Sequence, residues 1–160
     1  MKQFIKFSGL CAAVLALVTF ILQLASPAIT NINLLITTGK VSGTTAIFGG
    51  DNITLSWAAL IAWIFVLVSM LCLLAVSILP LVGVKALEKY ENLLLLVNAG
   101  LLLVAGIFMF IVFPTFAAAN GASGSSNGSV GAGWIIGGIL AILGACAAGL
   151  KPLLGLVGKK

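Results

Sequence analysis

The sequence predicts an all-α integral membrane protein, a four-transmembrane-helix bundle with a small extracellular β-hairpin in its first outer loop. Composition is the first reason: 62% of the 160 residues are hydrophobic and 7% are charged, and the mean hydropathy of +1.31 lies far outside the soluble range. The second reason is four apolar runs, each long enough for a helix to cross a hydrocarbon core of roughly 30 Å. The third is a charged segment in the middle of the chain, between two of these runs.

We expect a single domain over residues 1–160, because four spans of about 20 residues leave no room for a soluble unit beside them. The expected elements are spans at about residues 5–28, 55–84, 92–116 and 133–152, outer loops at 29–54 and 117–132, and an inner loop at 85–91. The first span begins and ends like a secretory signal peptide. Its apolar stretch is longer than such a peptide needs, so we expect it to be retained.

Two prolines indicate irregular helix ends. The second span, at about 1.5 Å per residue, is longer than the hydrocarbon core, so it should tilt or project, and Pro80 should kink its last turns. Regular helix in the third span should end at Pro114, which has no backbone N–H to donate.

The two outer loops have different compositions. Residues 31–38 and 44–48 are rich in β-branched and apolar side chains, and residues 39–43 supply turn-forming residues, which predicts a β-hairpin. The alternative is an irregular loop on the headgroups, since short apolar runs do not define one structure. Residues 120–133 are rich in glycine and serine and have no apolar periodicity, so we expect a flexible connector there.

Lysine positions predict the orientation. All basic residues are lysines, and seven fall on one side of an even-numbered bundle: Lys2, Lys6, Lys85, Lys89, Lys151, Lys159 and Lys160. Only Lys40 falls on the other side. By the positive-inside rule, both termini and the inner loop lie in the cytoplasm, and the protein is a multi-pass protein of the plasma membrane. Lysine use without arginine also favours an AT-rich bacterial genome.

Polar residues inside the expected spans are few and uncharged. Proton-coupled transporters and voltage sensors usually keep an ionisable group there, and this chain has none at the centre of any span. The intramembrane polar residues are Gln23, Ser77 and Asn98. Ser77 and Asn98 lie at similar depths, which predicts an interhelical hydrogen bond of roughly 0.6–2 kcal/mol. The alternative is a polar step in a permeation path.

Small residues mark the fourth span as the main close-packing helix, because helices in lipid associate through close approach. The helix-packing residues at four-residue spacing are Gly133, Gly137, Ala141, Ala145 and Gly149. We expect this band to pack inside the bundle against Gly9, Ala12, Ala13 and Ala16 of the first span. The alternative is that it also joins neighbouring copies. The expected interface anchors are Trp57, Tyr90 and Trp134.

The ionisable residues argue against catalysis. The chain has no histidine and no arginine, its acids are Asp51, Glu88 and Glu91, and its cysteines lie inside apolar runs. General acid–base and metal chemistry normally need more groups than these. We therefore expect no enzyme, no cofactor, no metal site and no nucleic-acid partner. The expected partners are the lipid bilayer and either further copies in a homo-oligomer or another membrane protein.

The layout of a short cytoplasmic start, a strand-bearing first outer loop, a short inner turn and a smaller second outer loop resembles the claudin-type tetraspan layout. The resemblance is one of topology. The first-loop signature of that family, a Trp, a Gly-Leu-Trp triplet and a cysteine pair, has no match in residues 30–56, and Trp57 stands beyond the loop. No residue and no function is carried over from it.

These observations favour a small non-enzymatic plasma-membrane protein with a structural role. It would act as a self-assembling or accessory subunit, with the outer hairpin as the contact surface. The alternative is a pore-forming or transporter subunit without ionisable membrane residues, in which several copies line a path with backbone and hydroxyl groups.

Overall fold

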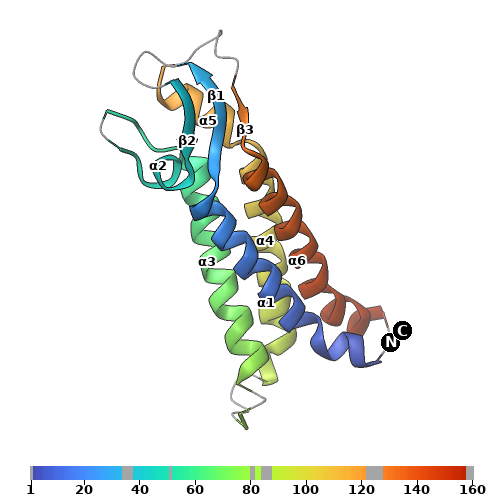
Figure 1. The fold of residues 1–160 in the computed structure, drawn as a ribbon. Coiled ribbons are helices and arrows are strands. Elements are labelled where there is room, and N and C mark those ends of the chain that lie inside the picture. The colour runs from blue at the N-terminus through green and yellow to red at the C-terminus, as the bar shows by residue number, and fades with distance from the viewer. Residues whose placement is uncertain are drawn as a thin grey trace.

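Four long helices form an elongated bundle in the computed structural model, which describes residues 2–33, 38–50, 52–79, 82–83, 88–121 and 128–157. The chain termini lie at one end of the bundle, and a small sheet lies at the other (Figure 1). We call these the terminal end and the sheet end. The helices are α1 (Lys2–Ala25), α3 (Trp57–Ile78), α4 (Glu91–Phe110) and α6 (Ala132–Val157). Within the described residues these four are long and apolar enough to cross a membrane, as expected.

Proline and a side-chain cap determine where α1 and α3 begin and end. α1 stops at Ala25, short of the predicted residue 28, because Pro27 disfavours helical backbone at the residue before it. Ser56 begins α3 by accepting a hydrogen bond from the Ala59 N–H at 3.4 Å. α3 ends at Ile78, well before the predicted residue 84. Pro80 lies outside the described residues.

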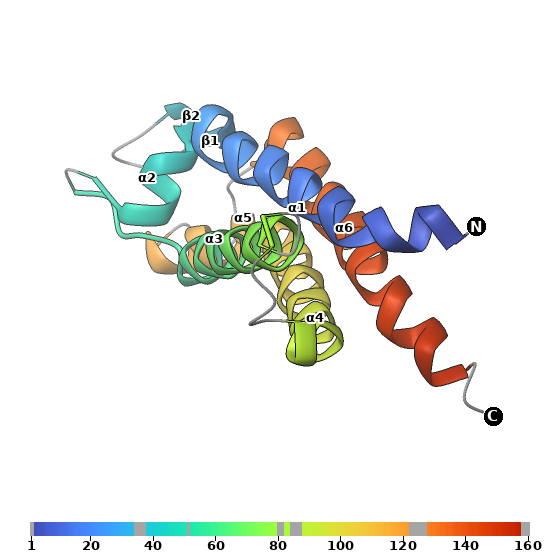
Figure 2. The same ribbon diagram turned by 90° about the horizontal axis from the view of Figure 1, so that it is seen from below.

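The third span is interrupted earlier than predicted and then continues. The backbone leaves the helix at Ile111 and resumes as α5 (Val112–Ala119). Pro114 is the third residue of α5, where a backbone N–H has no partner within the helix to lose. The prediction that regular helix ends at Pro114 was therefore wrong. α6 likewise continues past Pro152, and near the terminal end α1 and α6 spread away from α3 and α4 (Figure 2).

The first outer loop contains strands, but not where we predicted the second one. β1 (Pro27–Asn33) pairs antiparallel with β2 (Thr38–Ser42), and only Ser26 separates β1 from α1. Residues 44–48, predicted as the returning strand, belong instead to a short helix, α2 (Gly43–Phe48). The Ser42 hydroxyl accepts the Thr45 N–H at 3.1 Å, and this cap overrides the local β preference. Residues 34–37 of the predicted first strand lie outside the described residues.

The end of the second outer loop is ordered, contrary to the expected flexible connector. β3 (Ser129–Val130) pairs antiparallel with β1 and completes a sheet of order β2-β1-β3. The Gly131 N–H then donates to the Ala28 carbonyl at 2.7 Å. Residues 122–127 lie outside the described residues.

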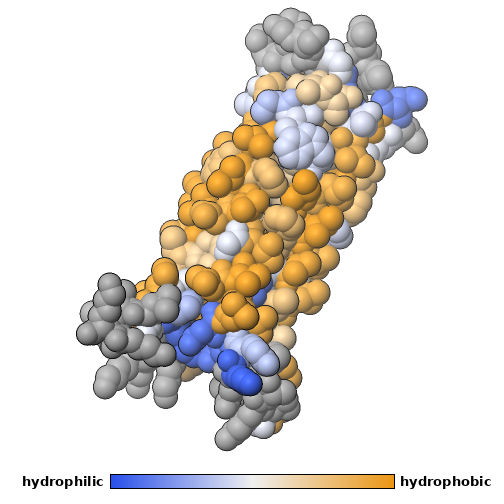
Figure 3. Space-filling model, turned by 180° about the vertical axis from the view of Figure 1, so that it is seen from behind, coloured by the Kyte–Doolittle hydropathy of each residue, from blue (hydrophilic) through white to orange (hydrophobic). Residues whose placement is uncertain are grey.

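Two buried clusters fill the bundle. The one nearer the terminal end joins α1, α3, α4 and α6, and includes Ala12, Ala16, Leu73, Leu95 and Leu102. The one nearer the sheet end joins the bundle to the strands, and includes Ile29, Ile47, Met109, Phe116 and Trp134. Large apolar side chains also point outward along the helices, so a broad hydrophobic belt separates two more polar ends (Figure 3).

Candidate functional site

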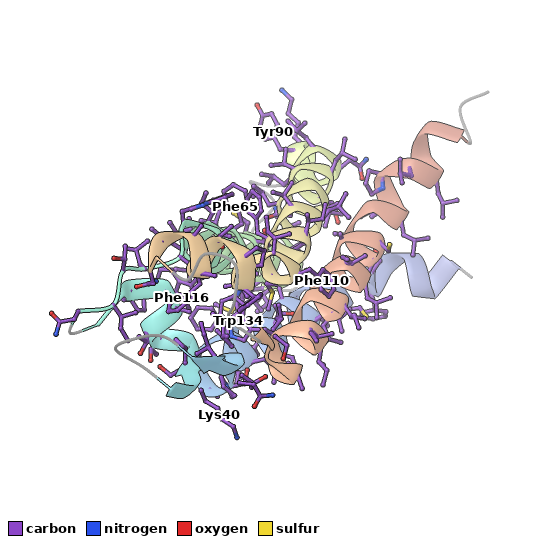
Figure 4. All side chains as sticks on the ribbon, turned by 90° about the horizontal axis from the view of Figure 1, so that it is seen from above. Lys40, Phe65, Tyr90, Phe110, Phe116 and Trp134 are labelled. Carbon is purple, nitrogen blue, oxygen red and sulfur yellow. The ribbon has the colours of Figure 1, made fainter. Side chains whose placement is uncertain are left out.

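A cap of three strands and two short helices closes the sheet end. We use the name cap for β1, β2, β3, α2 and α5. Ile29 and Ile32 of β1 are fully buried in the same cluster as Phe116 of α5 and Trp134 of α6. Seen from above, Phe116 and Trp134 lie in the interior, whereas Lys40 of β2 points away from the molecule (Figure 4). The cap is therefore continuous with the core of the bundle.

Asn120, the residue after α5, fastens the second outer loop to the first. Its Oδ1 accepts the Thr54 N–H at 2.7 Å, and its Nδ2 donates to the Thr54 carbonyl at 2.8 Å and to the Phe116 carbonyl at 3.0 Å. Close by, the Ser56 and Thr115 hydroxyls lie 2.7 Å apart and share a hydrogen bond. The two loops are thus joined at the sheet, and α5 is bonded to the start of α3 through both Thr115 and Asn120.

Replacing Asn120 by alanine should loosen this joint. The loss of its hydrogen bonds should lower the free energy of unfolding by roughly 1–2 kcal/mol and speed hydrogen exchange at the Thr54 amide. Asn120→Asp keeps the acceptor but loses both donated hydrogen bonds, so its free energy of unfolding should lie between those of Asn120→Ala and the wild type. Asn92→Ala, at an exposed position on α4, is the matched control. If the Thr54 amide exchanged at the wild-type rate in Asn120→Ala, the Asn120 hydrogen bonds would not stabilise the joint between the two loops.

Six buried side-chain polar atoms among the described residues have no hydrogen-bond partner. They are Gln23 Oε1 and Nε2, Trp63 Nε1, Ser69 Oγ, Asn98 Oδ1 and Trp134 Nε1. An unsatisfied buried polar group costs roughly 1–3 kcal/mol, so a concentration of them is unusual. Gln23 and Asn98 were expected inside the bundle, whereas Ser69 and Trp63 were not among the expected polar residues.

The predicted hydrogen bond between Ser77 and Asn98 does not form. Asn98 is buried, and its Nδ2 donates instead to the Leu94 carbonyl of its own helix at 2.7 Å. Ser77 faces α1, where a Cβ atom on Gly9 would lie 3.1 Å from its hydroxyl oxygen. The two residues also lie at different depths, since Ser77 is 20 residues from the sheet-end terminus of α3 (77 − 57) and Asn98 only 12 from that of α4 (110 − 98). The predicted equal depth was therefore wrong.

Ser69 matches Asn98 better than Ser77 does. Each lies twelve residues from the sheet-end terminus of its helix, since 69 − 57 and 110 − 98 are both 12. The Trp57 and Phe108 rings meet edge to face with their centroids 5.6 Å apart, and this contact aligns the sheet-end termini of α3 and α4. Ser69 Oγ can donate and Asn98 Oδ1 can accept, and both atoms are buried without partners. The middle of the bundle therefore carries a polar level with complementary groups.

Small residues bring α6 close to both of its neighbours. A Cβ atom on Gly106 of α4 would lie 2.9 Å from the Gly138 carbonyl oxygen, so the two backbones touch at this point. Gly137 faces α1 and α4, with Thr19 and Met109 nearest to it.

The residues of the expected packing band are placed as follows: Gly137, Ala141, Ala145 and Gly149 are buried, and Gly133 is half-buried. Ala13 of α1 is fully buried as well. Gly9 packs against Ser77 and Leu95, on α3 and α4, rather than against α6. The band is covered inside the chain, and the outward face of α6 carries larger side chains such as Ile136 and Leu143.

The three expected interface anchors have different environments. Trp57 and Tyr90 are 49% and 51% exposed, at the sheet end and the terminal end respectively, as an anchor requires. Trp134 is fully buried among cap residues, so its expected role was wrong. The small residues next to it in sequence let α6 approach its neighbours and enclose the indole.

Charges at the terminal end link α4 to α6. Residues 85–87 of the expected inner loop lie outside the described residues, and the chain continues through a short 3₁₀ helix, η1 (Glu88–Tyr90), into α4. The Glu91 carboxylate and the Lys151 ammonium form an ion pair at 2.5 Å, with both side chains about 30% exposed. The Lys89 ammonium nitrogen lies over the Tyr90 ring, 5.6 Å from its centroid.

The described part of the chain holds no group of three side chains able to ligate a metal ion. Comparisons with known proteins add nothing to this geometry: no family model, no curated protein and no solved structure matches the chain. The class defined here is therefore a four-helix bundle with a sheet-bearing cap and a partly polar interior.

Proposed function

We propose that the chain is a multi-pass protein of the plasma membrane with both termini in the cytoplasm. Four long apolar helices and the hydrophobic belt between polar ends support this assignment (Figure 3). Lys89 and Lys151 lie at the terminal end and Lys40 in the cap, and by the positive-inside rule this distribution supports an extracellular cap.

Cysteine labelling tests this orientation. In a variant without the native cysteines, Lys40→Cys should react with a membrane-impermeant thiol reagent in intact cells, and Lys89→Cys only after lysis. Both lysines are exposed in the structure, so reaction depends on the side of the membrane. Labelling at Lys89→Cys but not at Lys40→Cys in intact cells would reverse the topology.

The role that we infer is that of a non-enzymatic structural protein, a self-assembling or accessory subunit with the cap as its contact surface. The observation that carries this proposal is the joining of both outer loops into one ordered cap, through β1–β3 pairing and the hydrogen bonds between Asn120 and Thr54. An ordered surface loses less conformational entropy on binding than a mobile loop does. The buried packing band of α6 leaves the cap as the more suitable surface.

Cross-linking in native membranes tests the contact surface. A cysteine at Thr44, exposed on α2 of the cap, should give cross-linked species with a second copy or another membrane protein. A cysteine at Leu143, exposed on the outward face of α6, is the matched control and should give fewer. Equal yields at the two positions would remove the cap as the contact surface.

A pore-forming or transporter subunit is the second candidate, and the unpaired atoms of Ser69 and Asn98 favour it. Polar groups at mid-depth are what a conduction path through a bundle needs. Solute flux into liposomes separates the two roles. A structural protein should pass nothing above background, whereas a path should conduct and should be slowed by Asn98→Leu.

A further inference from the structure

Gln23 of α1 and Trp134 of α6 together carry three of the unpaired polar atoms. Gln23 is 0% exposed and both of its amide atoms lack partners. Trp134 is also 0% exposed, and its indole N–H has no acceptor. Exchanging the amide oxygen and nitrogen of Gln23 changes nothing, because neither position has a partner.

Both side chains come from the stretch where α1 and α6 run side by side. At one end of this stretch the Thr19 hydroxyl lies 3.3 Å from the Gly137 carbonyl and donates to it. At the other end a side chain on Gly133 would meet Ser26. The two unpaired side chains lie between these contacts along their helices, and so they share one level below the cap.

The chemistry of these groups defines what would satisfy them. The Gln23 amide and the Trp134 indole offer three N–H donors but one acceptor. A single hydroxyl group accepts two hydrogen bonds and donates one, so it would satisfy the amide oxygen and two of the three N–H groups. We propose that Gln23 and Trp134 bind a small neutral molecule with a hydroxyl oxygen, either water or a small alcohol, beneath the cap.

Charge excludes an anion as the occupant. Lys40 is the one cation among the described residues of the cap, and it is exposed and points away from the bundle (Figure 4). A buried anion at Gln23 would have no counter-charge, and burying an unpaired charge costs far more than burying a neutral hydroxyl.

A dry site and an occupied site predict opposite effects of Gln23→Leu. If the amide were truly unpaired, leucine of similar size would remove unsatisfied groups and raise the melting temperature. If the amide binds the proposed molecule, leucine removes those hydrogen bonds and leaves the indole N–H without an acceptor. The melting temperature should then fall. Trp134→Phe, which removes the indole N–H and part of the ring, should also lower the melting temperature.

The decisive measurement is made on the wild-type protein in nanodiscs, and variants serve only to assign its signals. Selective ¹⁵N labelling of glutamine and tryptophan gives two side-chain amide nitrogens, each with a pair of proton signals, and three indole N–H signals, since the chain has two glutamines and three tryptophans. Gln23→Leu and the single Trp→Phe variants assign these signals. The exposed Trp57 indole is the control for contact with bulk water.

We expect magnetisation transfer from long-lived bound water to the Gln23 amide and Trp134 indole protons. If glycerol, added as the probe alcohol, shifts both signals saturably and removes the water transfer, the site takes a small alcohol. If glycerol has no effect while the transfer is present, the site takes water. If both groups show contacts only with protein protons, ignore glycerol, and Gln23→Leu raises the melting temperature, the proposal is overturned.

Discussion

Gly106→Ala should destabilise the bundle by about 1–3 kcal/mol although alanine is the better helix former. The added Cβ would lie 2.9 Å from the Gly138 carbonyl oxygen and 2.8 Å from Ile142 Cγ1. A backbone oxygen cannot rotate away as a side chain can, so α4 and α6 would have to separate along their shared seam. Denaturant unfolding of the protein in mixed micelles measures the loss.

Gly100→Ala is the matched control on the same helix. Gly100 is exposed, and nothing lies within 4 Å of where its Cβ would stand. This substitution should be neutral or slightly stabilising, because it adds helix propensity without a clash. Equal stability of the two variants would mean that α4 and α6 are not in backbone contact.

Gly131→Ala should detach the second outer loop from the sheet. Its added Cβ would overlap the Pro27 carbonyl oxygen, a backbone atom of β1, while the Gly131 N–H must stay bonded to the Ala28 carbonyl. The clash cannot be relieved without opening the β1–β3 pair. We expect a loss of about 1–3 kcal/mol and rapid hydrogen exchange at Ile29 and Val130, which are paired across these strands.

A disulfide trap gives an independent reading of the same change. Thr30 and Ser129 are register partners whose hydroxyls lie 3.0 Å apart, so Thr30→Cys with Ser129→Cys should oxidise readily in the parent protein and poorly beside Gly131→Ala. Gly50→Ala, just after α2, is the control, since its Cβ would meet only Thr45 at 3.4 Å. Fast oxidation in the Gly131→Ala background would show that the pair survives the substitution.

The number and order of the long helices could be predicted because the length of an apolar run is a local property of the sequence. The exact ends were less accessible, since they depend on caps and on how a proline is used. Pro27 ends a helix region, whereas Pro114 and Pro152 lie inside helices. Ser42 shows that a local signal can also be overlooked, because its hydroxyl begins α2 within a stretch rich in β-formers.

The cap and the polar interior depend on contacts between distant residues. Asn120 bonds Thr54 across a separation of 66 residues, and β3, two residues long, has no periodicity of its own. Asn98 and Gln23 were recognisable as polar residues in apolar runs, but whether they find hydrogen-bond partners was not. The prediction of Ser77 as the partner of Asn98 was wrong, because the sequence alone does not show where α3 begins or how it is rotated about its axis.

The junction between α1 and β1 has a mechanical consequence. Ser26, the single residue between them, is held on one side by two hydrogen bonds to the Leu22 carbonyl and on the other by the Gly43 N–H on its own carbonyl. These bonds connect α1 and β1 rigidly, so the helix and the strand should move together. A bilayer of different thickness changes the tilt of a spanning helix. Through this rigid junction, a change in the tilt of α1 would move β1, the middle strand of the sheet, together with β2 and β3. A change in bilayer thickness would therefore move the cap.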